Sequence, residues 1–281
     1  MLSYGNHSVI LSAGIYRNPM KLNRIVDHRS EMISMMMECV SIHEYLDGIE
    51  IGFRYPEEVY QFKLTETQIE YVKSLRIRTA HFPYQNEIKD NNENRQLFKK
   101  IQEIYKQLGI QHTVFHPQYI SDIHFLKNAW EDLGNGAISI ESWIGAIDIS
   151  EKDFEKLFVF DDIGIVLDTC HTAISSQARI GFHFSYFMPK FEDKIKYIHL
   201  SGIKSQPTFS DPIDPSIQRF CTGHHLIHTL HPRDLAYFEP VWILLKKKKN
   251  ICVVLEPTID TLDNFPNEII NEVNFLNNEF K

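Results

Sequence analysis

Residues 163–172 read IGIVLDTCHT, an apolar run that ends in Asp168 and is followed three residues later by His171. The same arrangement, an apolar run that ends in a carboxylate or an imidazole, recurs along the chain. It returns as His81 in RTAHFPY, His116 in TVFHPQ, Glu141 in ISIESW, His199 in YIHLSG and Glu256 in VVLEPT. His224, in CTGHHLIH, follows in a loop. This repetition indicates a fold that gathers the ends of its strands in one place.

Eight apolar runs predict eight strands, and amphipathic stretches between them predict helices. Leu97, Ile101, Ile104 and Leu108, for example, recur at the three- and four-residue spacing of a helix. Strands that alternate with helices are the order of a single-domain α/β fold, the (β/α)8 or TIM barrel, whose parallel strands are buried on both faces. An open doubly wound sheet would usually carry a Gly-rich turn after its first strand, and SAGIYRNP does not supply one. The expected strands are 8–15, 47–53, 77–82, 111–116, 137–142, 163–168, 195–200 and 250–256, and the expected helices are 30–44, 64–75, 92–108, 122–133, 150–159, 184–193, 234–248 and 265–279.

The strand-end side chains are candidates for a metal site. A parallel barrel gathers the C-terminal ends of its strands at one mouth, and imidazoles and carboxylates that meet there suit transition metals. A single His or Asp at a strand end is more often structural, as a helix cap or a satisfied core group, but the joint placement favours a metal. Glu141 and Glu256 end apolar runs, and buried carboxylates are costly unless they are paired or bind a metal. The long connection 202–233 lies on the same expected face, and such length is typical of a functional loop.

Composition sets outer limits on the class of protein. A chain of 281 residues with a hydrophobic fraction of 43% fits one globular domain that spans residues 1–281. The net charge of −8 argues against a broad nucleic-acid-binding surface, and the four cysteines form no close pairs for a disulfide framework or a CxxC zinc site. No apolar run reaches membrane-spanning length, and the N-terminus lacks a signal pattern. We therefore expect a cytoplasmic protein with no membrane and no obligatory protein partner.

These motifs resemble the endonuclease IV family (family 2 apurinic/apyrimidinic endonucleases), within the xylose isomerase-like barrel superfamily, over essentially the whole chain. GIVLDTCHT is very close to the central motif of that family, FHP matches directly, and HFPY, LEPT and HLSGIK resemble further segments. The resemblance implies three zinc ions. It implies that the first is held by His81, His116 and Glu141, the second by Glu141, Asp168, His199 and Glu256, and the third by His171 and His224. It further implies substrate contacts from Tyr84, Lys204 and His225.

The chain departs from the family pattern in three places. The family has Asp-Arg-His-His where residues 222–225 read TGHH, so Thr222 replaces one aspartate ligand of the third zinc. Ser142 stands where the family has Asn after the bridging glutamate. Glu57 and Glu58 occupy the loop that in the family carries an Arg and penetrates DNA. The expected zinc count is therefore two or three.

The favoured function is that of a zinc-dependent hydrolase resembling endonuclease IV, which cleaves phosphodiesters and takes abasic sites in damaged DNA as an expected substrate. Glu141, as the bridging ligand, and Glu256, as a ligand that orients the nucleophile, are the expected catalytic residues. The alternative is a sugar or sugar-phosphate isomerase or epimerase, in which Glu141, Asp168, His199 and Glu256 hold one Mn²⁺ or Mg²⁺. The additional imidazoles of the first zinc site favour the hydrolase, and the acidic charge and altered loop favour the alternative. A third class is a non-catalytic metal-binding barrel, which would be inert toward both kinds of substrate.

Overall fold

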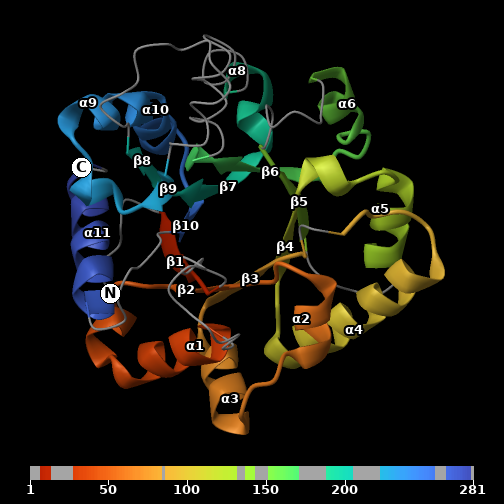
Figure 1. The fold of residues 1–281 in the computed structure, drawn as a ribbon. Helices are drawn as coiled ribbons and strands as arrows, with labels where there is room; N and C mark the ends of the chain where they lie inside the picture. Colours follow the sequence, from red (N-terminus) through yellow and green to blue (C-terminus); the bar gives the residue numbers. More distant parts are fainter. Residues whose placement is uncertain are drawn as a thin grey trace.

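A computed structural model describes residues 7–13, 28–83, 86–131, 137–142, 151–170, 188–204, 222–256 and 264–279. Eight parallel strands form a closed barrel in the order β1-β10-β7-β6-β5-β4-β3-β2, with helices around it (Figure 1). The (β/α)8 prediction is confirmed, and every expected strand is present. The barrel strands are β1 (Ser8–Ser12), β2 (Gly48–Gly52), β3 (Ile77–His81), β4 (His112–Phe115), β5 (Ala137–Glu141), β6 (Gly164–Asp168), β7 (Ile195–Leu200) and β10 (Cys252–Leu255).

The barrel strands alternate between an apolar outer face and a mixed inner face, where Ile10, Cys252 and Val254 form a small apolar cluster beside polar side chains. On β2, Ile49 and Ile51 belong to the main hydrophobic core under the helices, whereas Glu50 lies between them on the opposite face and is fully buried. Inside the barrel, His112 on β4 stacks on Tyr197 of β7 with ring centroids 3.7 Å apart. The expectation of strands buried on both faces is therefore right, but the inner face is built for polar chemistry.

The expected helices recur with shifted ends. Thr65 and Gln68 form the capping box that begins α3, and Gly109, with φ of 67°, ends α4 in the left-handed conformation that favours glycine. The stretch expected as one helix at 234–248 is divided by a 3₁₀ turn, Ala236–Phe238. The sequence did not predict α2, a short helix that follows β2. The helices are α1 (His28–Glu38), α2 (Pro56–Gln61), α3 (Glu66–Ser74), α4 (Asn92–Leu108), α5 (Ile123–Glu131), α6 (Glu151–Lys156), α8 (Met188–Phe191), α9 (Pro232–Leu235), α10 (Glu239–Lys247) and α11 (Phe265–Glu279). Of these described helices, none is long and apolar enough to cross a membrane.

An aromatic cluster fixes the ends of β3 and β4. Phe82 and Phe115 stack with centroids 4.8 Å apart, and Trp130 of α5 meets the Phe115 ring edge-on at 5.2 Å. Phe98 of α4 closes the cluster against Phe82 at 5.0 Å. Because side chains alternate along a strand, aromatic residues held against the helices turn their neighbours in sequence into the barrel. Those neighbours are His81 and His116.

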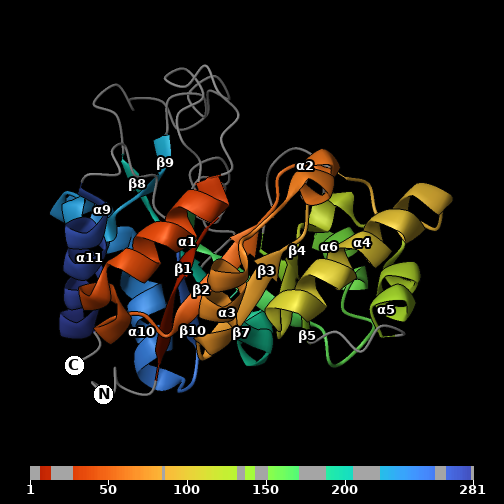
Figure 2. The ribbon, with the colours of Figure 1, turned by 90° about the horizontal axis from the view of Figure 1, so that it is seen from below.

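The two ends of the long connection after β7 pair with each other. β8 (Gly202–Lys204) and β9 (Thr222–His225) form a two-stranded antiparallel sheet. This sheet stands on the same side of the barrel as α2 (Figure 2). Both features follow the C-terminal ends of barrel strands, the side where active sites of this fold lie.

A buried carboxylate ties the segment after β9 to the last helix. Glu272 of α11 accepts the backbone N–H groups of Ile227 and His228 at 2.8 and 3.0 Å, and it lies 2.6 Å from Nδ1 of His228. Nε2 of the same imidazole is 3.1 Å from Glu268. The hydrogen bond and charge of Glu272, opposed by burial and aided by Glu268, raise the pKa of His228.

We expect His228→Gln to lower the stability of the protein by about 1.5–3 kcal/mol, the range for hydrogen bonds to charged groups. The folded-state pKa of His228 lies above its unfolded value of about 6.5, so the charged imidazole stabilises the fold fully below that pH. This contribution disappears as the pH rises through the folded pKa. The difference in melting temperature between wild type and variant should therefore shrink as the pH rises above the unfolded pKa of about 6.5 and through the folded pKa. The exposed His124→Gln serves as the control, and a difference that grows with pH would contradict the account.

Candidate metal centre

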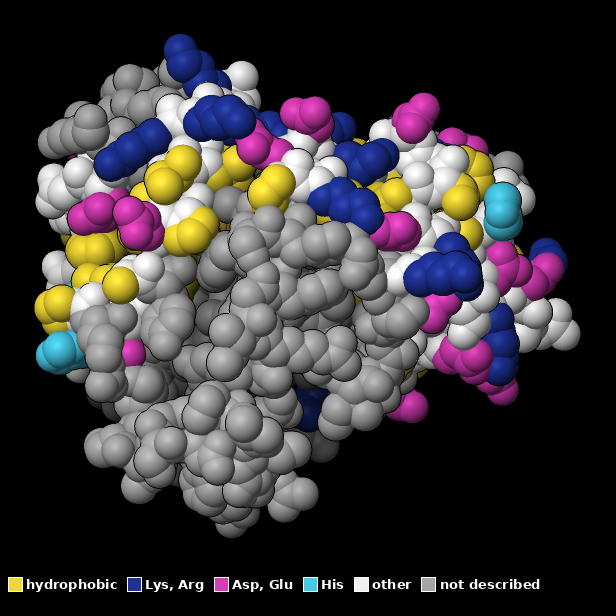
Figure 3. Space-filling view, turned by 90° about the horizontal axis from the view of Figure 1, so that it is seen from above, with side chains coloured by type: hydrophobic (Ala, Val, Ile, Leu, Met, Phe, Trp, Pro, Cys, Tyr) yellow, Lys and Arg dark blue, Asp and Glu magenta, His cyan; other side chains and the backbone are white. Residues whose placement is uncertain are grey.

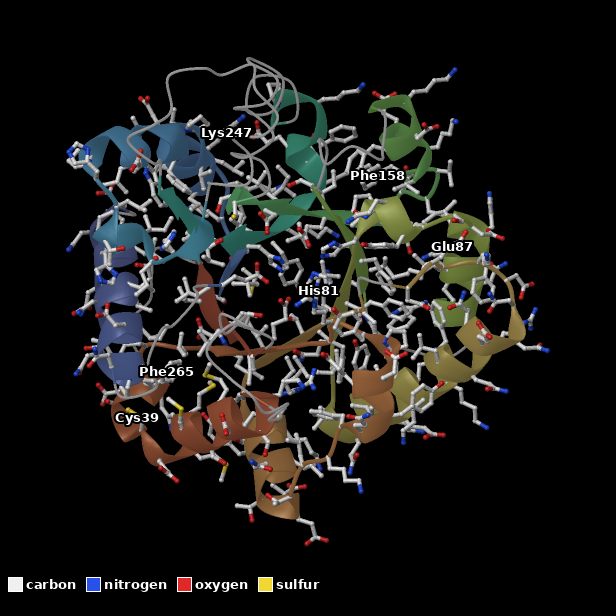
Figure 4. All side chains as sticks on the ribbon, in the orientation of Figure 1. Cys39, His81, Glu87, Phe158, Lys247 and Phe265 are labelled. Atoms are coloured by element: carbon white, nitrogen blue, oxygen red, sulfur yellow. The ribbon has the colours of Figure 1, made fainter. Side chains whose placement is uncertain are left out.

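Six of the strand-end residues meet inside one mouth of the barrel. His81, Glu141, Asp168 and His199 lie on β3, β5, β6 and β7, and His116 and Glu256 directly follow β4 and β10. Figure 4 shows His81 inside the ring of strands, whereas Glu87 and Phe158 lie outside it. The residues converge because all eight strands are parallel, so the last inward-facing side chain of each strand lies at the same end of the barrel.

The first group consists of His81, His116 and Glu141. Nε2 of each imidazole lies 3.0 Å from Oε2 of Glu141, and the two Nε2 atoms are themselves 3.0 Å apart. Two nitrogens bound tetrahedrally at about 2.0–2.1 Å from one zinc ion would be roughly 3.3 Å apart. The spacing of these three donors is therefore close to that of a tetrahedral zinc site.

Hydrogen bonds on the far side of each ring set which nitrogen faces the centre. Nδ1–H of His81 donates to the carbonyl of Phe82 at 3.0 Å, which leaves Nε2 as the lone-pair atom that faces Glu141. The amide nitrogen of Gln118 donates to Nδ1 of His116 at 3.3 Å, so this nitrogen is occupied on the outer side and Nε2 of the ring faces Glu141. The backbone carbonyl behind His81 is an outer partner of the kind typical of histidines that bind metals.

The second group surrounds Nδ1 of His199. This nitrogen lies 3.4 Å from Oε1 of Glu256, 3.9 Å from Oδ2 of Asp168 and 4.0 Å from Oε2 of Glu141. The Glu141 oxygen here is the same atom that contacts both imidazoles of the first group. Glu141 therefore belongs to both groups and lies between them.

A bulge between β6 and β7 gives His199 its inward direction. Ile165 pairs with Ile195, but Val166 pairs with Tyr197, so β7 carries one extra residue and Asp168 pairs with His199. In a regular ladder Asp168 would pair with Ile198, and the imidazole would point toward the helices. The bulge thus aims a side chain into the site, a known use of such irregularities.

Hydrogen bonds to backbone groups hold the strand ends below the mouth. The hydroxyl of Ser142 accepts the backbone N–H of Asp168 at 2.8 Å, and Thr169 donates its hydroxyl to the carbonyls of His199 and Ser201. Ser142, which replaces the family's Asn, therefore has a structural contact in this chain.

Charge at the mouth is unevenly balanced. Burial lowers the pKa of His199, but Glu256, Glu50 and Glu141 outweigh it and raise the pKa well above the ordinary value. Burial raises the pKa of Glu256 to about 8, opposed by His199 and reinforced by Asp168 and the other nearby carboxylates. Several carboxylates thus crowd around few positive charges.

The donor set fits divalent transition-metal ions. The donor atoms of His81, His116 and Glu141 lie within 4.8 Å of one another, as do those of Glu141, Asp168 and His199, and all of these residues are buried. Glu256 shares such a cluster with His199 and Glu50. Nitrogen and oxygen donors in this mixture suit zinc, and a bound cation would compensate the negative charge of the carboxylates. Glu141 belongs to two of these clusters.

The other expected site residues are placed only in part. His171 and Tyr84 lie outside the described residues, and the side chains of His224 and Lys204 are likewise not described. His225 is half-buried on β9, with its backbone opposite Gly202. The expected third zinc and the substrate contacts therefore stay predictions.

Sequence reasoning overlooked Glu50 and overstated the acidity of the second loop. Glu50 lies in the middle of a strand rather than at its end, yet a carboxylate inside the apolar run GIEIG carries the same signal that identified Glu141. Glu58 is not a free negative charge, because it forms a 2.8 Å ion pair with Arg29 and accepts the backbone N–H of Arg54. Glu57 alone of that pair is exposed.

The fold is shared with proteins of known structure. A scan against family models gives no match, and neither does a search of curated proteins by sequence. Endonuclease IV from Thermus thermophilus superposes with a TM-score of 0.60 at 15% identity, covering 98% of each chain. The AsfvAP:AG crystal structure gives 0.62 at 12% identity over 99% of each chain. A xylose isomerase-like TIM barrel protein from Mycobacterium smegmatis, in complex with magnesium, gives 0.58 at 11% over the full length of both. The chain therefore has the barrel fold common to endonuclease IV and xylose isomerase-like proteins.

We expect Glu141→Gln to weaken zinc binding more than the roughly 10–100-fold loss typical of an outer hydrogen-bond partner, because both groups lose a shared charged donor. The fold should survive, because barrel stability lies mainly in the strand and helix core. Zinc titration against a chelator, with circular dichroism as the check on folding, measures both. Glu272→Gln, an equally buried glutamate on α11, is the matched control. Unchanged zinc affinity in Glu141→Gln would make this glutamate merely structural.

Proposed function

We propose that this chain is a zinc-dependent phosphodiesterase resembling endonuclease IV. The observation that carries the proposal is the shared carboxylate of Glu141, 3.0 Å from both imidazoles of the first group and also part of the second. A site for a single ion would have no need of His81 and His116. Two neighbouring metal ions are the usual device for hydrolysing phosphodiesters, since together they activate a water and stabilise the leaving oxygen.

The protein's own side chains would hold and orient this chemistry. Glu141 would fix the separation between the two groups, because its carboxylate is nearly inaccessible on β5 and has little freedom to move. Glu256 retains 14% exposure of its side chain and lies at the open edge of the second group. It would therefore meet a water or substrate phosphate and orient the attacking oxygen. In this proposal abasic DNA is one substrate, with the damaged nucleotide extruded from the helix into the mouth.

Charges of both signs are mixed on a side of the barrel (Figure 3). On the face shown in Figure 3, Lys and Arg side chains are interspersed with Asp and Glu. The whole chain carries a net charge of −8, although Arg29 neutralises Glu58 beside the mouth. Duplex binding depends on neutralising phosphates, so binding by this protein would be weak and sensitive to salt.

The second candidate is a sugar or sugar-phosphate isomerase or epimerase. The observation that favours it is the second group itself, in which Asp168, His199 and Glu256 meet Glu141 as a complete set for one Mn²⁺ or Mg²⁺. A single ion there would polarise a carbonyl while a carboxylate moves a proton. In this reading the first group would be dispensable.

We expect the purified zinc-loaded protein to nick duplex DNA at an abasic site, and His81→Ala and His116→Ala each to reduce the rate at least about 100-fold. His124→Ala, an exposed histidine on α5, is the matched control and should keep wild-type activity. The same proteins loaded with manganese are assayed for interconversion of a ketose and its epimer. Epimerisation that survives both histidine variants, with no cleavage of DNA or simple phosphodiesters, would replace the proposed function with the second candidate.

A further inference from the structure

Glu50 is a carboxylate buried inside the barrel, one layer below the candidate metal centre. It projects from the middle of β2, opposite Ser12 of β1 and Thr79 of β3 in the strand register. The next inward position on β2 is Gly52, opposite His81. Because glycine has no side chain, nothing from β2 stands between Glu50 and the metal-facing layer above it.

Both oxygens of Glu50 have hydrogen-bond partners. Oε2 lies 3.3 Å from Nε2 of His199 and accepts the hydroxyl of Thr79 at 3.1 Å, and Oε1 lies 3.5 Å from the hydroxyl of Ser12. A fully buried carboxylate is costly unless it is paired and hydrogen-bonded. Burial would raise the pKa of Glu50, but the charge and hydrogen bond of His199 lower it below its ordinary value.

The imidazole of His199 stands between Glu50 and the upper carboxylates. Its Nε2 faces Glu50, whereas its Nδ1 faces Glu256 at 3.4 Å and Asp168 at 3.9 Å. The lone pairs of the two ring nitrogens diverge, so an ion bound at Nδ1 lies on the side of the ring away from Glu50. The nitrogen that binds a metal is set by the hydrogen bond that the other nitrogen makes.

We propose that Glu50 is a positioning residue of the metal centre: it accepts Nε2–H of His199 and thereby presents Nδ1 to the ion without binding that ion itself. The inference rests on the metal centre of the proposed function and holds for either substrate class. A carboxylate behind a ligating imidazole fixes the tautomer and ring orientation and increases the basicity of the metal-facing nitrogen. Glu50, His199 and Glu256 could also be grouped as direct donors to one ion. The placement of Glu50 and Glu256 at opposite nitrogens of His199 argues against that grouping.

The test uses zinc affinity and the number of metal ligands in Glu50→Gln. We expect zinc affinity to fall by about 10–100-fold, the usual effect of losing such a partner. X-ray absorption of the zinc-loaded variant should show an unchanged number of nitrogen and oxygen neighbours. The control is Glu272→Gln, because Glu272 is equally buried and contacts a histidine, His228. This variant should bind zinc with wild-type affinity. Unchanged affinity in Glu50→Gln, or the loss of one oxygen neighbour, would overturn the inference.

A second measurement needs no variant of Glu50. In ¹⁵N-histidine spectra of the zinc-loaded wild type, His199 should be protonated at Nε2 and bound to metal at Nδ1. The opposite assignment would overturn the inference even if Glu50→Gln failed to fold. Wild-type protein that binds no zinc would instead overturn the proposed function, which separates the failure of the two proposals.

Discussion

The arrangement of the mouth depends on one buried carboxylate, that of Glu141. Its Oε2 atom lies 3.0 Å from two imidazole nitrogens and 4.0 Å from a third. A buried charge of this kind persists only where opposite charges or metal ions compensate it. The three imidazoles lie around this one oxygen, and Asp168 and Glu256 approach it through His199. We therefore regard the need to compensate the buried negative charge of Glu141 as the main constraint on the residues around it.

The barrel meets this constraint with rigid elements rather than loops. Aromatic packing behind β3 and β4 turns His81 and His116 inward, and the bulge before Tyr197 does the same for His199. Beneath them, Glu50 and its hydrogen-bond partners lie in the barrel interior, which in most proteins of this fold holds bulky branched side chains. The inner face thus combines a small apolar cluster of Ile10, Cys252 and Val254 with polar contacts that fix ring orientation. Stability is left to the outer core, where strands meet helices.

Much of the fold and site could be predicted from the sequence because both depend on local patterns. The barrel follows from the alternation of apolar runs and amphipathic stretches, and the strand-end residues follow from where those runs stop. The bulge in β7 could not be predicted, because it depends on pairing between strands that the chain does not encode locally. Glu50 carried a readable signal, a charge within GIEIG, but an expectation based on strand ends passes over the middle of a strand. The pairing of Glu58 with Arg29 joins residues from two separate segments, and no spacing rule connects them.

Crystallography with anomalous scattering at the zinc edge tests the central claim most directly, because it counts and locates ions in one experiment. The account predicts at least two peaks in zinc-loaded protein. One should lie among His81, His116 and Glu141, and another among Glu141, Asp168, His199 and Glu256. A single peak at the second position, with the two imidazoles of the first group bonded only to protein atoms, would contradict the shared role of Glu141. No peak at either position would remove the metal centre altogether.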